Sequence, residues 1–192
     1  MIVMGCDASL TCTGISAIQL GHISADFKPD NSQVFTTTIE PVKMRGLERL
    51  KFIRNEFSRH LRTLAPAVVV FEGYARGATT YREEMGEVQG ILRMRTFDEG
   101  TEVLIVTPQG LKKFATSKGN GDKSVVRACV ERRWGLVSDN ITHDEVDAYV
   151  LMMVGAAIKK QFTLASYQTD VIKTTLANPH GEAKGKKKAV TV

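Results

Sequence analysis

Short apolar runs and helically spaced apolar residues alternate along the chain. Three strands are predicted within the first forty residues, at 2–8, 14–20 and 34–39, because each is rich in apolar or β-branched residues. The short polar connections between them indicate an antiparallel meander. The later apolar runs at 67–71 and 103–106 predict two more strands. The first of these is apolar at every position, which is typical of a strand covered on both faces.

Helices are predicted between and after these strands. One apolar stripe recurs at helical spacing and consists of Leu47, Leu50, Ile53, Phe57, Leu61 and Leu64. Further helices are expected at 81–97, from Pro108 onward, at 123–134 before Gly135, and from a Thr142 cap to about Lys160. Glu145 completes a capping box with Thr142. The order β-β-β-α-β-α-β-α-α-α predicts an α/β fold with a mixed sheet and helices on its faces.

The length and charge of the chain suggest one domain with a basic extension. The 192 residues suffice for one core, which we place in residues 1–162. Residues 163–192 are expected to form an extension that ends in a disordered, Lys-rich tail. Five Lys and one Glu from Lys173 onward account for +4 of the net charge of +5. Such a tail suits a polyanionic partner, or it simply keeps the protein in solution.

The cysteines and the apolar segments bear on the compartment. Three cysteines without a Cys-x-x-Cys pair argue against a disulfide framework or a structural zinc site and favour a reducing cytoplasm. The N-terminus lacks the basic and long apolar segments of a signal peptide. The longest apolar stretch, 146–158, contains Asp147 and is too short to span a bilayer. We therefore expect a cytoplasmic protein without membrane association.

Four carboxylates lie at the edges of apolar segments. Asp7 ends the first predicted strand, Glu72 ends the fourth, and Asp144 and Asp147 open the last predicted helix. Asp144 and Asp147 are three residues apart, so one helix face presents both. Buried acids that gather without a cation are costly, which makes a metal site the natural interpretation. Taken singly, each acid fits a helix cap or a surface charge equally well.

The ordered set of motifs resembles the RuvC family of Holliday junction resolvases, which belong to the ribonuclease H-like superfamily. The resemblance covers about residues 1–160. It is carried by Gly5-Cys6-Asp7-Ala8-Ser9-Leu10-Thr11-Cys12-Thr13-Gly14, Val69-Val70-Phe71-Glu72, Thr107-Pro108-Gln109 with Lys112, Gly119-Asn120-Gly121-Asp122-Lys123-Ser124, and His143-Asp144-Glu145-Val146-Asp147-Ala148. The family often has Pro-Gly after the first Asp, where this chain has Ala8-Ser9. That difference, with a slightly shorter loop after Glu72, suggests a diverged, phage-type member.

The resemblance implies a two-metal nuclease site. Asp7, Glu72, Asp144 and Asp147 would hold two Mg²⁺ ions, for which Mn²⁺ can substitute. Lys112 and Lys123 match lysines near the scissile phosphate, and His143 is a candidate supporting residue. The candidate DNA contacts are Tyr74, Arg76, Arg82, Lys113 and Lys118. Among them, Tyr74 matches the place of an aromatic residue that probes the junction centre.

The expected function is paired cleavage of four-way DNA junctions by a homodimer. In the family, dimer contacts come from helices beside the loop after the strand-end Glu, which corresponds here to residues 87–94, with Val88, Ile91 and Leu92 as contacts or as core. Another ribonuclease H-like nuclease, acting on forks, flaps or RNA–DNA hybrids, is the alternative. An actin-like ATPase would need a second phosphate loop and a longer chain. A non-catalytic DNA-binding protein would gain nothing from four clustered acids.

Overall fold

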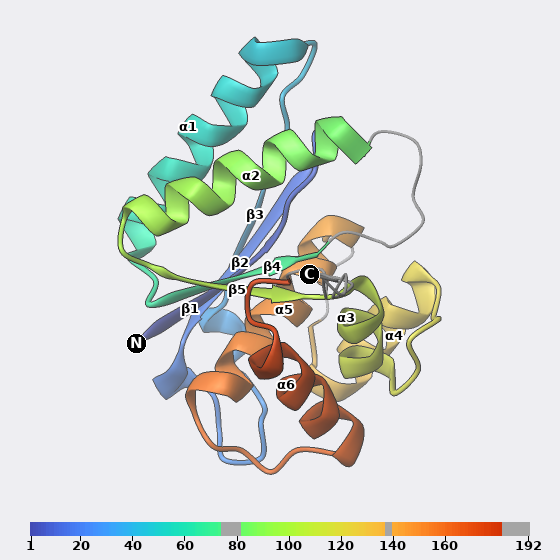
Figure 1. The fold of residues 1–192 in the computed structure, drawn as a ribbon. Helices are drawn as coiled ribbons and strands as arrows, with labels where there is room; N and C mark the ends of the chain where they lie inside the picture. The colour runs from blue at the N-terminus through green and yellow to red at the C-terminus, as the bar shows by residue number, and fades with distance from the viewer. Residues whose placement is uncertain (74–81, 137–139, 182–192) are drawn as a thin grey trace, which may run out of the picture.

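A five-stranded mixed sheet with helices on both faces forms the fold in the computed structural model, which describes residues 1–73, 82–136 and 140–181 (Figure 1). The strands are β1 (Ile2–Asp7), β2 (Thr13–Gln19), β3 (Phe35–Ile39), β4 (Val68–Glu72) and β5 (Glu102–Val106). The helices are α1 (Gly46–Leu64), α2 (Arg82–Asp98), α3 (Pro108–Thr116), α4 (Lys123–Trp134), α5 (His143–Lys159) and α6 (Ser166–Ala177). Two short 3-10 turns, Leu20–His22 and Asn31–Gln33, lie between β2 and β3.

The sheet order is β3-β2-β1-β4-β5. β1, β2 and β3 form the predicted antiparallel meander, whereas β4 and β5 join β1 in parallel. The register pairs Cys6 with Phe71 and Asp7 with Gly14. The next residues along β1 and β4 are Asp7 and Glu72, so these two strand-end acids lie side by side on neighbouring strands, which run about 4.8 Å apart.

Strand alternation sorts the core into two layers. Met4 and Cys6 of β1 pack against α1 and α2, whereas Val3 faces α5 on the opposite side of the sheet. α5 is apolar after its first turns, and its residues from Ala148 to Ala156 are all buried. The predicted apolar helix therefore runs across the sheet as the centre of the larger layer, with α3, α4 and α6 beside it (Figure 1).

Three glycines allow α5 to approach the sheet closely. A Cβ added to Gly5 would lie 2.0 Å from the backbone oxygen of Ala148, and one on Gly14 would lie 2.1 Å from that of Asp144. A Cβ on Gly155, at the other end of the helix, would lie 2.5 Å from Val3 Cγ1. No side chain fits at these distances. The short distance between the α5 axis and the sheet therefore depends on glycine at these three positions.

Two features of the helices differ from the sequence prediction. The apolar stripe of α1 is buried at Leu50, Ile53, Phe57 and Leu61, but Leu47 is 82% exposed because the first turn of α1 extends beyond the sheet. Helix α6 was not predicted. It packs on α3, with Val171 in the core and Gln168 Nε2 donating to the backbone oxygen of Phe114. The boundary at residue 162 stays a prediction.

Candidate active site

The end of β1 is held by a hydrogen-bonded turn. Thr13 Oγ1 accepts from the Ser9 N–H at 3.1 Å and donates to the Ser9 carbonyl oxygen at 2.7 Å. Ser9 Oγ accepts from the backbone N–H groups of Thr11 and Cys12. Ser9 therefore supplies a hydroxyl that organises the turn directly after Asp7, at the end of β1.

Asp7 and Glu72 both face α5. Asp7 shares its strand face with Val3 and Gly5, and Glu72 shares its face with Val68 and Val70, because successive strand residues alternate. Asp7 is buried, and Glu72 is partly buried.

The first turn of α5 supplies the other two acids. Thr142 Oγ1 accepts from the Glu145 N–H at 3.2 Å, while Glu145 Oε2 accepts from the Thr142 N–H at 2.8 Å. This confirms the predicted capping box and turns Glu145 away from the cluster. Asp144 and Asp147 then face the sheet near Asp7, because Gly14 lets the backbone of Asp144 approach β2.

The four acids interact electrostatically. Burial raises the pKa of Asp7 well above its usual value, and the charges of Glu72, Asp147 and Asp144 raise it further. Burial, with the charge of Asp147, raises the pKa of Glu72 to about 7. Burial also raises the pKa of Asp147. Hydrogen bonding with Asp7 lowers the pKa of Glu72 and so offsets part of this rise. Raised carboxyl pKa values favour protonation where no divalent cation relieves the repulsion.

The two candidate lysines face this cluster from α3 and α4. Lys123 Nζ lies 4.0 Å from Asp144 Oδ1, and its charge lowers the pKa of Asp7, Glu72 and Asp147. Lys112 lowers the pKa of Glu72 and Asp147. Lys112 is placed by the start of α3, where Thr107 Oγ1 caps the Gly110 N–H at 3.0 Å. Six of the predicted residues therefore meet at one edge of the sheet.

The donor set fits a hard divalent cation, although the ligands are not yet gathered around a centre. Among the described His, Cys, Asp and Glu residues, no group of three or more is arranged so that it could hold a metal ion. The four carboxylates still face one another, and oxygen donors are those that Mg²⁺ and Mn²⁺ prefer. A divalent cation would relieve the repulsion among these carboxylates.

Cys12 is a site residue that the sequence did not reveal. Its thiol hydrogen-bonds to Asp144, and burial followed by that bond raises the pKa of Cys12 to about 12. Its Sγ also lies 4.0 Å from Oε1 of Glu40, the residue after β3. The position of Cys12 five residues after Asp7, at the start of the returning strand, was the only sequence signal for this contact.

The other predicted residues are more scattered. His143 is exposed, and its charge lowers the pKa of Asp147. Lys118 is exposed in the loop between α3 and α4. Arg82 opens α2, but its side chain lies outside the described residues, as do Tyr74 and Arg76 entirely.

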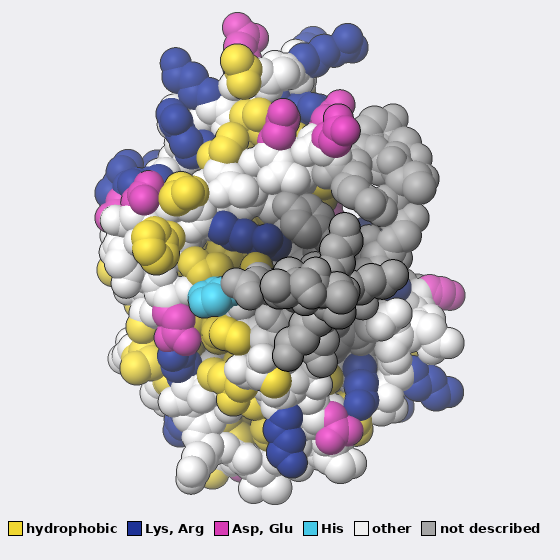
Figure 2. Space-filling model, viewed as in Figure 1, with side chains coloured by type: hydrophobic (Ala, Val, Ile, Leu, Met, Phe, Trp, Pro, Cys, Tyr) yellow, Lys and Arg dark blue, Asp and Glu magenta, His cyan; other side chains and the backbone are white. Residues whose placement is uncertain are grey.

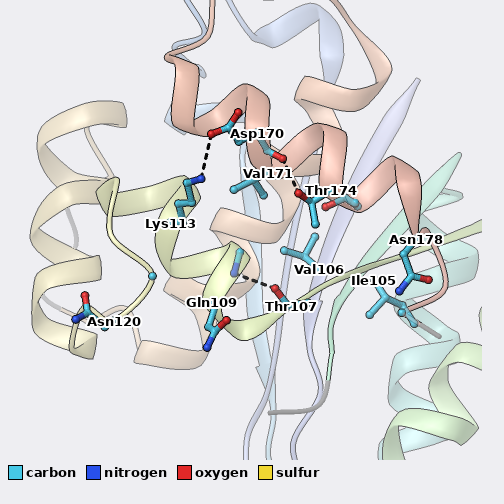
Figure 3. Close-up of a pocket in the computed structure, with 14 residues that line it drawn as sticks. Ile105, Val106, Thr107, Gln109, Lys113, Asn120, Asp170, Val171, Thr174 and Asn178 are labelled. Atoms are coloured by element: carbon cyan, nitrogen blue, oxygen red, sulfur yellow. Dashed lines mark hydrogen bonds and ion pairs between the residues drawn. The ribbon is translucent and has the colours of Figure 1, made fainter. Parts of the chain in front are cut away.

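A cavity of about 460 Å³ lies beside the site, between the end of β5, α3 and α6 (Figure 3). Lys113 points across it and forms an ion pair with Asp170 at 3.1 Å. None of the four acids lines this cavity. The candidate active site is therefore the acid cluster at the sheet edge and not the cavity.

Sequence comparison finds relatives that are named as crossover junction endodeoxyribonucleases. The chain is 30% identical over 153 residues to the crossover junction endodeoxyribonuclease RuvC of Nocardia farcinica, covering 79% of this chain and 78% of that one. It is 31% identical over 153 residues to the RuvC of Mycobacterium ulcerans, covering 79% and 80%. No protein-family model matches the chain.

Solved structures show the same fold. Thermus thermophilus RuvC superposes with a TM-score of 0.65 at 19% identity, over 80% of this chain and 92% of that one. The yeast mitochondrial Holliday junction resolvase Ydc2 gives 0.52 at 12% identity, over 91% and 83%. The predicted ribonuclease H-like α/β fold is therefore confirmed.

Proposed function

The chain belongs to the RuvC family of crossover junction endodeoxyribonucleases, and from this premise we propose that it resolves four-way DNA junctions by hydrolysing phosphodiester bonds. The observation that carries the proposal is the meeting of four acids and two lysines at one sheet edge. Relatives named for crossover junction cleavage match most of the chain, and T. thermophilus RuvC, solved with a Holliday junction substrate, has a TM-score of 0.65.

The site residues have different roles in the proposed hydrolysis. Asp7, Glu72, Asp144 and Asp147 would hold two Mg²⁺ ions, which activate a water molecule and stabilise the leaving oxygen when bound. Lys112 and Lys123 bind the non-bridging phosphate oxygens and offset the charge that develops on them. The charge of His143, at the start of α5, lowers the pKa of Asp147 and so favours its ionised, metal-binding form.

DNA outside the scissile phosphate is held by basic and aromatic groups around the site. Lys118 is exposed in the loop after α3, where it suits a backbone phosphate, and Lys113 would have to leave its ion pair with Asp170 to bind one. Tyr74, Arg76 and Arg82 belong to the segment after Glu72, where an aromatic ring suits an unpaired base at the branch point.

Two symmetric cuts require two active sites, and a homodimer supplies them. Of the three predicted contacts, Val88 and Leu92 are core residues, whereas Ile91 is only partly buried. A groove of about 680 Å³ between α1 and α2 includes Ile91 and the exposed Met94. This groove is our proposed subunit contact.

None of the described helices is both long and apolar enough to cross a membrane. We place the enzyme in the cytoplasm, where its DNA substrate is.

Cleavage of defined DNA substrates tests the function. We expect paired nicks in a synthetic four-way junction with Mg²⁺, little cutting of a linear duplex, fork or RNA–DNA hybrid, and none with chelator. Asp7→Asn should abolish nicking but retain junction binding, because it removes one ligand and leaves the basic residues. The matched control is Asp26→Asn, which changes an exposed acid in the connection between β2 and β3. Equal cutting of linear duplex would disprove junction selectivity.

A further inference from the structure

The connection from β3 to α1 carries exposed apolar and cationic side chains in alternation. We call residues 42–47 the α1 tip. Within it, Val42 is 68% exposed and Leu47 is 82% exposed, while Lys43 and Arg45 are exposed between them. Figure 2 shows an apolar side chain at the projecting end of α1, with an acidic side chain directly next to it and Lys or Arg side chains on either side. Val42 and Leu47 belong to neither core cluster, so their side chains are available to a binding partner.

The α1 tip starts from the same sheet edge as the acids. Ile39 at the end of β3 pairs with Thr13, directly beside the pair of Asp7 and Gly14. Glu40 then approaches Cys12, whose thiol bonds to Asp144. The chain therefore passes the acid cluster immediately before it enters the tip.

The other end of the α1 tip is fixed against α2. Arg49, two residues beyond the tip, pairs with Glu84 in the first turn of α2 at 3.4 Å. Helix α1 projects past the sheet on this side (Figure 1). The α1 tip thus lies at the projecting end of α1, beyond the start of α2 as seen from the sheet (Figure 1).

The backbone of the α1 tip is ordered. Val42 N–H donates to the Glu40 oxygen at 3.0 Å, and Met44 N–H donates to the Pro41 oxygen at 3.3 Å. Lys43 has a left-handed φ of 61°, and Gly46 has one of 50°. A bulky residue adopts this conformation only when the surrounding structure holds it. The apolar side chains are therefore presented outward by a defined turn.

We propose that the α1 tip packs against the DNA arm beside the cleaved phosphate, an inference that rests on the proposed function. Lys43 and Arg45 contact backbone phosphates, while Val42 and Leu47 press on sugar and base edges, as apolar wedges do in bent or unstacked DNA. Charge favours DNA over a protein surface here, because residues 42–47 contain two cations and no acid, although Glu48 follows.

Another exposed apolar residue lacks these features and serves as a control. Phe97, at the end of α2, is 72% exposed, but Asp98 and Glu99 follow it directly. Two adjacent acids would repel phosphates. Phe97 therefore matches Leu47 in exposure, but two acids follow it directly, whereas residues 42–47 contain two cations and no acid.

Junction affinity in the Asp7→Asn background, measured by fluorescence anisotropy over a range of salt, tests the proposal without cleavage. Lys43→Gln with Arg45→Gln should reduce the slope of log affinity against log salt by about 2, since each phosphate contact contributes about 0.9. Leu47→Ser should weaken binding by about tenfold with little change of slope. Phe97→Ser should change neither quantity, and all variants should melt close to their parent because the replaced side chains are exposed.

The outcomes separate this proposal from the proposed function. If the unmodified enzyme cuts junctions and both tip variants bind normally, the α1 tip makes no DNA contact and the proposal is wrong. If tip variants lose self-association in sedimentation while a monomer binds DNA as before, the tip is a subunit contact, which also overturns it. If the enzyme cuts no junction but tip variants still lose DNA affinity, the nuclease function fails and the DNA contact stands.

Discussion

Replacing Gly14 by Ala should separate the two halves of the acid cluster. The new Cβ would lie 2.1 Å from the backbone oxygen of Asp144, whereas ordinary contact begins at 3.4 Å. The first turn of α5 would have to retreat from β2 by about 1.3 Å, the difference between these distances. Asp144 moves with that turn, while Asp7 stays on β1.

A shift of this size is large for catalysis and moderate for stability. Displacement of a reacting group by about 1 Å can cost on the order of 10²-fold in rate. Overpacking of a close contact costs about 1–3 kcal/mol of unfolding free energy. We therefore expect Gly14→Ala to slow junction cleavage by about 10²-fold, while junction affinity changes less than about threefold because the basic residues remain.

Single-turnover cleavage at saturating Mg²⁺ measures the rate, and anisotropy with Ca²⁺ in place of Mg²⁺ measures binding. Gly155→Ala is the matched control, because its Cβ would meet Val3 Cγ1 at 2.5 Å at the far end of the same helix. It should cost comparable stability and leave most of the cleavage rate. Gly21→Ala, with nothing within 4 Å of the new Cβ, should change neither the stability nor the cleavage rate. If Gly14→Ala cuts as fast as the unmodified protein, close approach of α5 does not position the acids.

Two further predictions concern charge in the site. Glu72 binds a proton up to about pH 7 in the folded chain but only to about 4.5 when unfolded, so the metal-free protein should lose stability as pH rises through that window. Melting temperatures in chelator between pH 4 and 8 should fall less for Glu72→Gln than for the unmodified protein, and parallel curves would refute this. Lys123→Gln should slow cleavage by about 10–10²-fold with little effect on melting, because its side chain is 61% exposed. Lys173→Gln, on the exposed side of α6, should leave the rate unchanged, and an equal loss there would show a general charge effect.

Local patterns in the sequence were sufficient to predict the sheet and the acid positions. Apolar runs ended by an acid gave β1 and β4, and the Thr142 capping box fixed the start of α5. Alternation along the strands then places Asp7 and Glu72 on one face. These features depend on residues that are close in sequence, and periodicity and capping rules therefore predict them.

Features set by long-range packing could not be predicted in this way. Helix α6 contains four Thr or Ser residues, whose helix propensity is modest, and contacts with α3 stabilise it instead. Leu47 continues the apolar stripe of α1 but has no layer beneath it, because the sheet ends first. Cys12 meets Asp144 only through the close approach of α5 to β2.

The division of the site between rigid and exposed elements has a functional consequence. Asp144 and Asp147 belong to a helix that is buried from Ala148 to Ala156, so they cannot move far to relieve their repulsion with Asp7. Lys123 lies at the solvent border, where its side chain is free to follow a bound phosphate. A bound cation would therefore relieve the repulsion among acids that are held in place, whereas the side chain of Lys123 adjusts to the substrate. Metal binding should accordingly stabilise the fold, while lysine substitutions should affect the rate alone.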